Sequence, residues 1–426
     1  MRAPLIATLL AVAAAPGNPE AAAGDAAFAL DALEKKAGHF FRAKGVDWKK
    51  VRAEIGRAAA KSDSTDAHYA VLVRLVARLR DGHAAVIPKE GAKDAKWPGP
   101  ALEKGPGMFW CLADGKVLVK NAWGAAEAAG VKAGMEIVAA DDLPVRKWLD
   151  RRIEELSDTH GFSTRQQAEY YACHWGLAGP AGSTLSIEFR GPDGKTARAA
   201  LERGDGGVVA RGPAFPPEGL QSVDRQSFGK TPKGFGYIHL RDTPEGLPAQ
   251  VDTMLAGIGE VPGLVLDFRG NGGGAFDHAA LLGRFVPKGR RIAFTETYAS
   301  AGDRPFEGPV VVIVDAGVRS AGETGSGIFK EDGRAYMIGE SPTAGMSSSK
   351  QVLELPSGLF SIRFSVDSNM NRFNGGKGVE GIGVQPHEVV PYDAKDLAAG
   401  VDTLIRRAEA LLEKFPQGSV KYKPPR

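Results

Sequence analysis

The sequence predicts an α/β fold for the C-terminal half of the chain, preceded by a helical region and a β-rich region. From Phe235 onward, short apolar runs rich in β-branched residues alternate with segments of helical periodicity. That alternation is typical of a layer architecture with a buried sheet. The expected strands are 236–240, 264–268, 310–314 and 336–339.

The chain has 426 residues, too many for one ordinary hydrophobic core, so two or three domains are expected. Its 43% hydrophobic and 25% charged residues are ordinary for a folded protein. Shifts in periodicity divide the chain. The predicted parts are a signal peptide at 1–23, a helical region at 24–100, a β-rich domain at 105–203, a Gly/Pro-rich linker at 204–219 and the α/β core at 220–426.

The N-terminus has the pattern of a secretory signal. The basic start Met1-Arg2 is followed by an apolar stretch at 3–15 and by small residues at Ala21 and Ala23. This order predicts export, to the periplasm or the extracellular space, with cleavage near Ala23. The apolar run is too short to span a bilayer, and the rest of the chain offers no second candidate, so no stable membrane span is expected.

The composition argues against several other classes of function. A net charge of +3 with scattered basic pairs does not predict nucleic-acid binding. No Cys/His cluster has zinc-ligand spacing, so no metal or cofactor is expected. Export permits a disulfide between Cys111 and Cys173, although two buried free thiols are equally compatible with the sequence. No feature predicts a particular oligomeric state.

The helical region contains three stretches of apolar residues at helical spacing, within 28–41, 48–59 and 67–80. Asp66 is expected to cap the third helix, and Gly82 to take the left-handed position after it. His83 comes next, and 84–87 is expected to be a short strand.

In the β-rich region, strands are expected at 116–120 and after the turn in 131–138, with a short helix at 125–129. A hairpin is expected across Gly191–Gly194, and the stretch 148–175 is expected to be helical. In the α/β part, helices are expected at 275–286 and 394–415.

Two strand ends carry the candidate chemistry. Ser320 follows the apolar run 309–314 and a tight turn, at the point where a helix should begin. This arrangement exposes a hydroxyl beside the unpaired N–H groups of a helix N-terminus. The glycine-rich turn 270–274 follows another buried strand. A serine nucleophile and backbone donors for an oxyanion are the components of an acyl-transfer site.

Simpler interpretations exist for both features. Ser320 could only cap its helix. The glycine-rich turn could hold a phosphate, although it lacks the Lys-Ser/Thr pair of a P-loop and the spacing of a dinucleotide-binding motif. A base and an orienting group must therefore come from elsewhere in the chain.

Five motifs occur in the order found in tail-specific (C-terminal processing) serine proteases, and the chain resembles this family over nearly its whole length. The motifs are Asp81-Gly82-His83, Gly130–Met135, Leu266–Gly274, Ser320–Glu323 and Gly378–Pro386. The resemblance implies a crotonase-like α/β core, a PDZ-like domain in the β-rich region and an N-terminal helical domain. It also implies polypeptide substrates, cut near their C-termini.

The family has two catalytic variants. In one, a lysine is the base, but Met346 stands at that position here, and Lys350 could substitute only if the loop bulged. The other resembles the core of tricorn protease, with a histidine from the N-terminal region and a glutamate near the C-terminus. His83 and Glu380 match these residues, although Gly82 stands where tricorn has a serine.

The resemblance thus implies a complete set of site residues. Ser320 would be the nucleophile and His83 its base, which then protonates the leaving amine. Glu380 would orient the imidazole. The oxyanion would be held by backbone N–H groups of Gly272, Gly273 and Ala321.

The predicted function is that of an exported serine endopeptidase. The alternative is a non-catalytic peptide- or lipid-binding protein on the same fold; a third possibility is a processing factor whose PDZ-like module only docks partners. The candidate peptide-binding residues of that module are Gly107, Met108 and Phe109, which could also be plain core residues.

Overall fold

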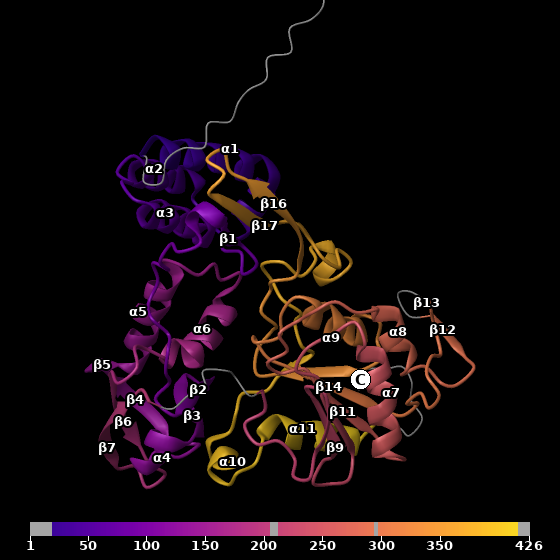
Figure 1. The fold of residues 1–426 in the computed structure, drawn as a ribbon. Coiled ribbons are helices and arrows are strands. Elements are labelled where there is room, and N and C mark those ends of the chain that lie inside the picture. Colours follow the sequence, from indigo (N-terminus) through magenta and orange to yellow (C-terminus); the bar gives the residue numbers. More distant parts are fainter. Residues whose placement is uncertain (1–18, 205–211, 294–296, 416–426) are drawn as a thin grey trace, which may run out of the picture. The chain divides into compact units, whose positions relative to one another are not determined.

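The computed structural model describes residues 19–204, 212–293 and 297–415. The chain forms two compact units, and Figure 1 labels many of their helices and strands. We call them the helical unit, which comprises Met1–Gly99, Asp158–Gly161 and Lys350–Val366, and the larger unit, which comprises the remaining residues. The expected signal peptide lies mostly outside the described residues, and its cleavage and export stay predictions.

The helical unit contains the three helices that the periodicity predicted, together with a three-stranded antiparallel sheet of order β1-β17-β16. Its elements are α1 (Pro19–Ala43), α2 (Trp48–Ala59), α3 (Thr65–Arg78), β1 (Ala85–Pro88), η1 (Glu90–Ala92), β16 (Ser348–Glu354) and β17 (Phe360–Ser368). The predicted extent of the α/β core, 220–426, therefore needs a correction. Lys350–Val366 was assigned to the α/β core, but it returns to pair with β1 and completes the helical unit's own core.

Two details around α3 also differ from expectation. Ser64, not Asp66, caps the helix, since its side chain accepts the N–H of Ala67. The Asp66 carboxylate instead accepts the N–H of Lys96. After the helix, the left-handed conformation belongs to Arg80, with φ +50°, and not to Gly82.

Within the larger unit, residues 100–157 and 162–204 form the β-rich module, a sheet of order β2-β3-β4-β6-β7 packed on two helices. The strands β3 and β4 and the hairpin lie where the sequence predicted them, but β2 was not predicted, and the stretch 148–175 forms two helices with a break between them. The elements are β2 (Met108–Ala113), β3 (Lys116–Ala122), α4 (Gly124–Ala128), β4 (Glu136–Ala140), β5 (Leu143–Pro144), α5 (Val145–Ser157), α6 (Arg165–Cys173), η2 (Trp175–Leu177), β6 (Thr184–Arg190) and β7 (Thr196–Glu202).

The rest of the larger unit is an α/β layer built on a seven-stranded sheet of order β18-β15-β14-β11-β10-β9-β8. The five strands from β18 to β10 are parallel, and β9 and β8 continue as antiparallel edge strands. The strands are β8 (Gln221–Val223), β9 (Gln226–Lys230), β10 (Gly236–His239), β11 (Leu264–Asp267), β14 (Val310–Val314), β15 (Tyr336–Gly339) and β18 (Glu388–Val389). A two-stranded ribbon, β12 (Arg291–Ala293) and β13 (Thr297–Ala299), lies apart from this sheet.

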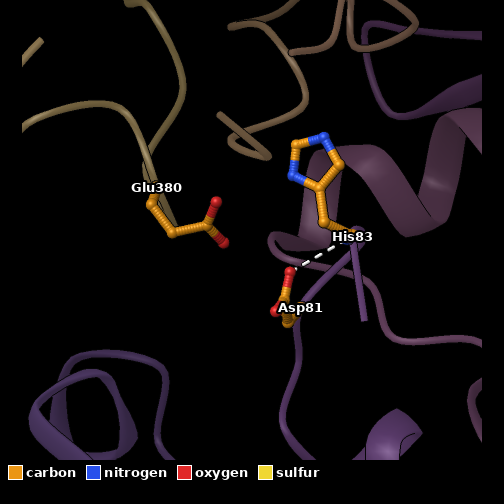
Figure 2. A group of neighbouring side chains, drawn as sticks. All are labelled: Asp81, His83 and Glu380. Carbon is orange, nitrogen blue, oxygen red and sulfur yellow. Dashed lines mark hydrogen bonds between the residues drawn. The ribbon is translucent and has the colours of Figure 1, made fainter. Parts of the chain in front are cut away.

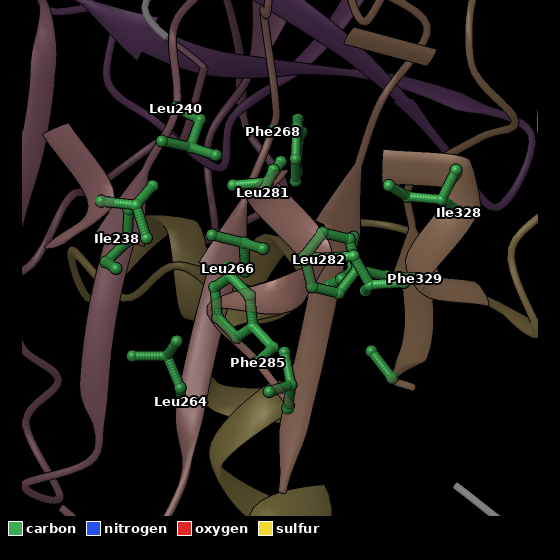
Figure 3. Close-up of a cluster of buried hydrophobic side chains, with 14 of the residues drawn as sticks. Ile238, Leu240, Leu264, Leu266, Phe268, Leu281, Leu282, Phe285, Ile328 and Phe329 are labelled. Carbon is green, nitrogen blue, oxygen red and sulfur yellow. The ribbon is translucent and has the colours of Figure 1, made fainter. Parts of the chain in front are cut away.

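Helices cover both faces of the sheet because alternate residues of its buried strands point to opposite sides. On one face, Leu264 and Leu266 pack with α7 (Leu247–Ile258), α8 (His278–Gly283) and α9 (Ala321–Glu331), as Figure 3 shows for much of this cluster. On the other face, Val265 packs with α11 (Thr403–Leu412).

Two predicted helices are shorter than expected. The stretch 275–286 is helical only in α8. The stretch 394–415 is two helices, α10 (Ala394–Ala398) and α11, because Gly400 adopts φ +72° and Asp402 starts a new helix as its N-cap. Within the described residues, no helix combines the length and the apolar character needed to cross a membrane.

A fully buried arginine joins β11 to the C-terminal helix. Arg269 lies between the carboxylates of Asp267 and Asp402, at 2.6 and 2.9 Å, and donates to the Tyr392 hydroxyl. Asp402 also accepts the N–H groups of Leu404 and Ile405 at the start of α11. Asp267 and Arg269 therefore brace the core between β11 and α11.

Replacing Asp402 with alanine should lower the free energy of unfolding by about 3–5 kcal/mol, because Arg269 would keep its buried charge with one partner lost. Urea denaturation of the purified protein measures this. The matched control is Asp150→Ala, which breaks an exposed pair with Arg165 and should cost at most about 1 kcal/mol. Equal effects of the two substitutions would contradict the bracing role.

Candidate active site

Ser320 lies between the end of β14 and the first residue of α9, as the sequence predicted. Its backbone has φ +56° and ψ −127°, a conformation that residues other than glycine rarely adopt. The N–H of Ser320 donates to the carbonyl of Met346 at 3.0 Å and faces the Glu323 carboxylate at 3.2 Å. Such a strained residue at a strand–turn–helix junction is typical of an activated nucleophile.

The glycine-rich turn after β11 packs against this serine. Parallel pairing of β11 with β14 brings the two strand ends to the same edge of the sheet. A Cβ atom on Gly273 would lie 2.7 Å from Cβ of Ser320, and Gly273 has φ +83°. The carbonyl of Asn271 accepts the N–H of Arg319, which fixes the turn beside the candidate nucleophile. Only glycine at 273 permits this approach.

Two of the three expected oxyanion donors are bonded to other groups in this structure, and their role stays a prediction. The N–H of Gly272 donates to the carbonyl of Arg241 at 3.0 Å, and the N–H of Gly273 donates to Oδ1 of Asn271 at 2.8 Å. In this conformation both groups stabilise the turn itself. The N–H of Ala321 differs, because it begins α9 and the first N–H groups of a helix have no partner within the helix.

A buried carboxylate, Glu323, organises the loops around Ser320. Its two oxygens accept from the Thr343 hydroxyl and from the N–H groups of Gly345, Met346 and Ser320, at 2.6, 2.7, 2.9 and 3.2 Å. Burial raises the pKa of Glu323 to about 8 despite these donors, and the charge of Glu380 adds to the increase. This residue fixes the nucleophile's turn to the loop 343–346.

A second buried carboxylate, Asp315, joins the nucleophile's turn to the glycine-rich turn. Its Oδ1 accepts the N–H groups of Gly270 and Gly317, each at 2.9 Å. Burial raises the pKa of Asp315 to about 7, and the nearby carboxylate of Glu340 contributes. Asp315 therefore holds both strand ends of the candidate site.

Glu380 lies in the same unit as Ser320 and is buried. Its carboxylate accepts from the hydroxyl of Ser163 at 3.0 Å, and its N–H donates to the hydroxyl of Ser368. The next residue, Gly381, donates its N–H to the carbonyl of Gly345 at 2.7 Å. The loop of Glu380 is thus bonded to the same segment that Glu323 holds.

His83 belongs to the helical unit, where it follows α3 and precedes β1. Its N–H donates to Oδ1 of Asp81 at 2.9 Å, drawn as the dashed line in Figure 2. Asp81 is buried and also accepts from the N–H and the hydroxyl of Ser365, at 2.7 and 2.9 Å. The Asp81 carboxylate therefore fixes the backbone that presents the imidazole. Figure 2 also draws Glu380, which comes from the larger unit.

The positions of the lysine-variant residues argue against a Ser–Lys pair. Met346 is buried, and its sulfur accepts from the side-chain amide of Gln167. Lys350 is exposed to solvent on β16. At the position where the lysine variant has its base, this chain therefore has a buried methionine.

The candidate peptide-binding residues lie in the core of the β-rich module. Met108 and Phe109 are 1% and 2% exposed, and Phe109 packs on the rings of Trp123 and His174. The carbonyl of Gly107 accepts the N–H of Trp123. These contacts favour the core interpretation, and docking of peptides on Gly107, Met108 and Phe109 stays a prediction.

Both cysteines are free, buried thiols in this structure. Burial raises the pKa of Cys111 and of Cys173, so neither thiol is suited to nucleophilic attack.

Sequence reasoning missed three residues of the site. Glu323 could have been found, because a serine followed three residues later by glutamate is the pattern of a capping box. Asp315 and Ser163 carry no such local signal. The bond from Asp315 to Gly270 spans 45 residues of the chain, and the bond from Ser163 to Glu380 spans 217.

Asp315 gives the stability of the protein a distinctive pH dependence. Burial favours the neutral form of Asp315 in the folded state. The contribution of this residue to the free energy of unfolding is therefore greatest below pH about 4, and it is lost as the pH rises through about 7. The free energy of unfolding of the wild type, minus that of Asp315→Asn, should therefore fall across this window, by at most about 1.4 kcal/mol per pH unit. Urea denaturation at several pH values tests this. A constant difference would contradict the assignment.

Comparison with known proteins identifies the α/β layer. Residues 234–390 match the model of peptidase family S41. The carboxyl-terminal-processing protease of Picosynechococcus sp. is 25% identical over 277 residues, which cover 63% of this chain and 58% of that protein. The chloroplastic C-terminal processing peptidase of Tetradesmus obliquus is 27% identical over 295 residues, which cover 65% and 58%. The chain thus spans about three fifths of the length of these curated relatives.

The fold is also similar to that of solved structures. The crystal structure of mature CPAF superimposes with a TM-score of 0.62 at 14% identity, over 93% of this chain and 96% of that one. The complex of mature CPAF with lactacystin gives 0.60 at 15% identity, over 93% and 98%. The family match covers the strands and turns that carry Ser320 and Glu380, and residues 234–390 therefore resemble the peptidases of family S41.

Proposed function

We propose that this protein is an exported serine endopeptidase that hydrolyses polypeptides by acyl-enzyme chemistry, with Ser320 as nucleophile and His83 as base. The observation that carries the proposal is the backbone of Ser320. Its positive φ is maintained by bonds to Met346 and Glu323, at the N-terminus of α9 and against Gly273. A residue that only capped a helix would adopt ordinary extended backbone and would need no such strain.

The proposed mechanism begins when His83 accepts the proton of the Ser320 hydroxyl as its oxygen attacks the carbonyl carbon of the substrate. The tetrahedral intermediate collapses as the C–N bond breaks, and the imidazolium gives its proton to the leaving amine. Water, deprotonated by the same imidazole, then releases the acyl group. Glu380 would orient the imidazole and stabilise its charged form.

The N–H of Ala321 is the proposed donor to the oxyanion. It begins α9, so the helix dipole adds a favourable field for the negative charge that develops there. Gly273 would contribute mainly by letting the substrate's carbonyl approach, since its own N–H is bonded to Asn271.

The substrate class is proposed from the relatives. Both curated relatives are named for C-terminal processing, and we propose that this protein likewise cuts polypeptides near their C-termini. The crotonase-like description of the core and the PDZ-like description of the β-rich module belong to the same proposal. The signal-like sequence at 1–23 supports export.

Replacing Ser320 with alanine should abolish hydrolysis of casein without loss of the folded state, because the attacking oxygen is removed. Release of acid-soluble fragments measures activity, and circular dichroism checks the fold. Ser326→Ala is the matched control, since Ser326 is a buried serine of the same helix whose hydroxyl donates to a backbone carbonyl. Activity retained in Ser320→Ala would end the serine-peptidase proposal.

Substitution of the two candidate bases should have opposite effects on activity. His83→Ala should be nearly inactive, whereas Lys350→Ala should keep most of its activity, because Lys350 is exposed on β16. The wild-type rate should fall in acid as the imidazole becomes protonated and can no longer accept a proton. Initial rates of casein hydrolysis against pH test both statements. Loss of activity in the lysine variant alone would establish a Ser–Lys mechanism instead.

A further inference from the structure

We propose that Ser163, at the start of α6 in the β-rich module, is a positioning residue that acts through Glu380, so that the site is incomplete without this module. The inference rests on the proposed function. It adds a component that no motif of the sequence indicated.

The contact is direct and buried. The hydroxyl of Ser163 donates to Oε1 of Glu380 at 3.0 Å, and each residue is 5% exposed. A hydrogen bond to an ionised group away from water is stronger than one between neutral groups. This bond therefore restricts both the direction of the carboxylate and the loop that carries it.

Ser163 is itself held in place by the helix that it precedes. Its N–H donates to the side-chain oxygen of Gln167 at 2.7 Å, while Thr164 caps the helix by accepting the N–H of Gln167. The amide nitrogen of Gln167 donates to the sulfur of Met346 at 2.9 Å. Since the carbonyl of Met346 accepts the N–H of Ser320, the same turn of α6 is linked to the nucleophile.

Two further side chains attach this turn to the loops of the site. The hydroxyl of Thr164 donates to the carbonyl of Ala344 at 2.7 Å. The amide of Gln166 donates to the carbonyls of Thr343 and Ile382, each at 3.1 Å. The first turn of α6 therefore contacts both the loop that Glu323 holds and the loop that carries Glu380. Ser163, which precedes this turn, contacts the Glu380 carboxylate.

The hydroxyl also limits how the carboxylate can turn. Glu380 is buried, and the bond from Ser163 fixes the direction of one of its oxygens. A fixed direction is what a carboxylate needs in order to orient an imidazole. Removing the donor therefore loosens the carboxylate.

The test compares Ser163→Ala with Ser163→Thr in the full chain, using casein and a fluorogenic peptide. Ser163→Ala should lower kcat roughly 10- to 100-fold, with KM changed less than twofold, because the lost bond serves the reaction rather than substrate binding. Ser163→Thr keeps the hydroxyl and should restore most of kcat. Ser183→Ala is the matched control, since Ser183 lies in the same module and bonds to Pro180 and Arg203.

Three outcomes would overturn the inference. The first is an unchanged kcat in Ser163→Ala, and the second is a loss that appears entirely in KM. The third is a Ser163→Thr variant that is folded, by circular dichroism, yet as impaired as the alanine variant. A wild type that hydrolyses neither substrate and does not react with a fluorophosphonate would instead refute the proposed function, so the two failures are distinguishable.

Discussion

The parallel pairing of β11 with β14 is the constraint on which the candidate site depends. Leu264 pairs with Val310, and the register continues to Asp267 and Ile313, so the two strands end at the same edge of the sheet. The glycine-rich turn and the turn of Ser320 must then lie side by side. A shift of one residue in this register would reverse which side chains face each helical layer, and the cores on both faces of the sheet oppose such a shift.

Three buried ionisable side chains fix the geometry of these turns. Asp315 binds the backbone of both turns, Glu323 binds the loop that supports Ser320, and Arg269 joins β11 to the C-terminal helix. Each of these groups loses solvation on burial and is compensated by bonds to the backbone or to an opposite charge. The strained backbone of Ser320 is maintained by this surrounding network.

Much of the architecture was predictable because it is encoded locally. The β-branched runs marked the central strands, and the spacing of apolar residues marked the helices. The return of 350–366 to β1 was missed, since strand pairing across more than two hundred residues leaves no local pattern. At the site, the strand–turn–helix pattern located Ser320 and the neighbouring glycines. It could not show that the amides of Gly272 and Gly273 bond within their own turn, or that Ser163 meets Glu380, because both depend on tertiary packing.

The central claim is that Ser320 is the activated nucleophile, and the most direct measurement is the site of covalent attachment of a fluorophosphonate. The wild-type protein would be treated with the reagent, digested and examined by peptide-mapping mass spectrometry. We expect one modified peptide, with the phosphonyl group on Ser320 and a reaction much faster than with free serine. A label on another residue, or no label on a preparation that hydrolyses casein, would contradict it.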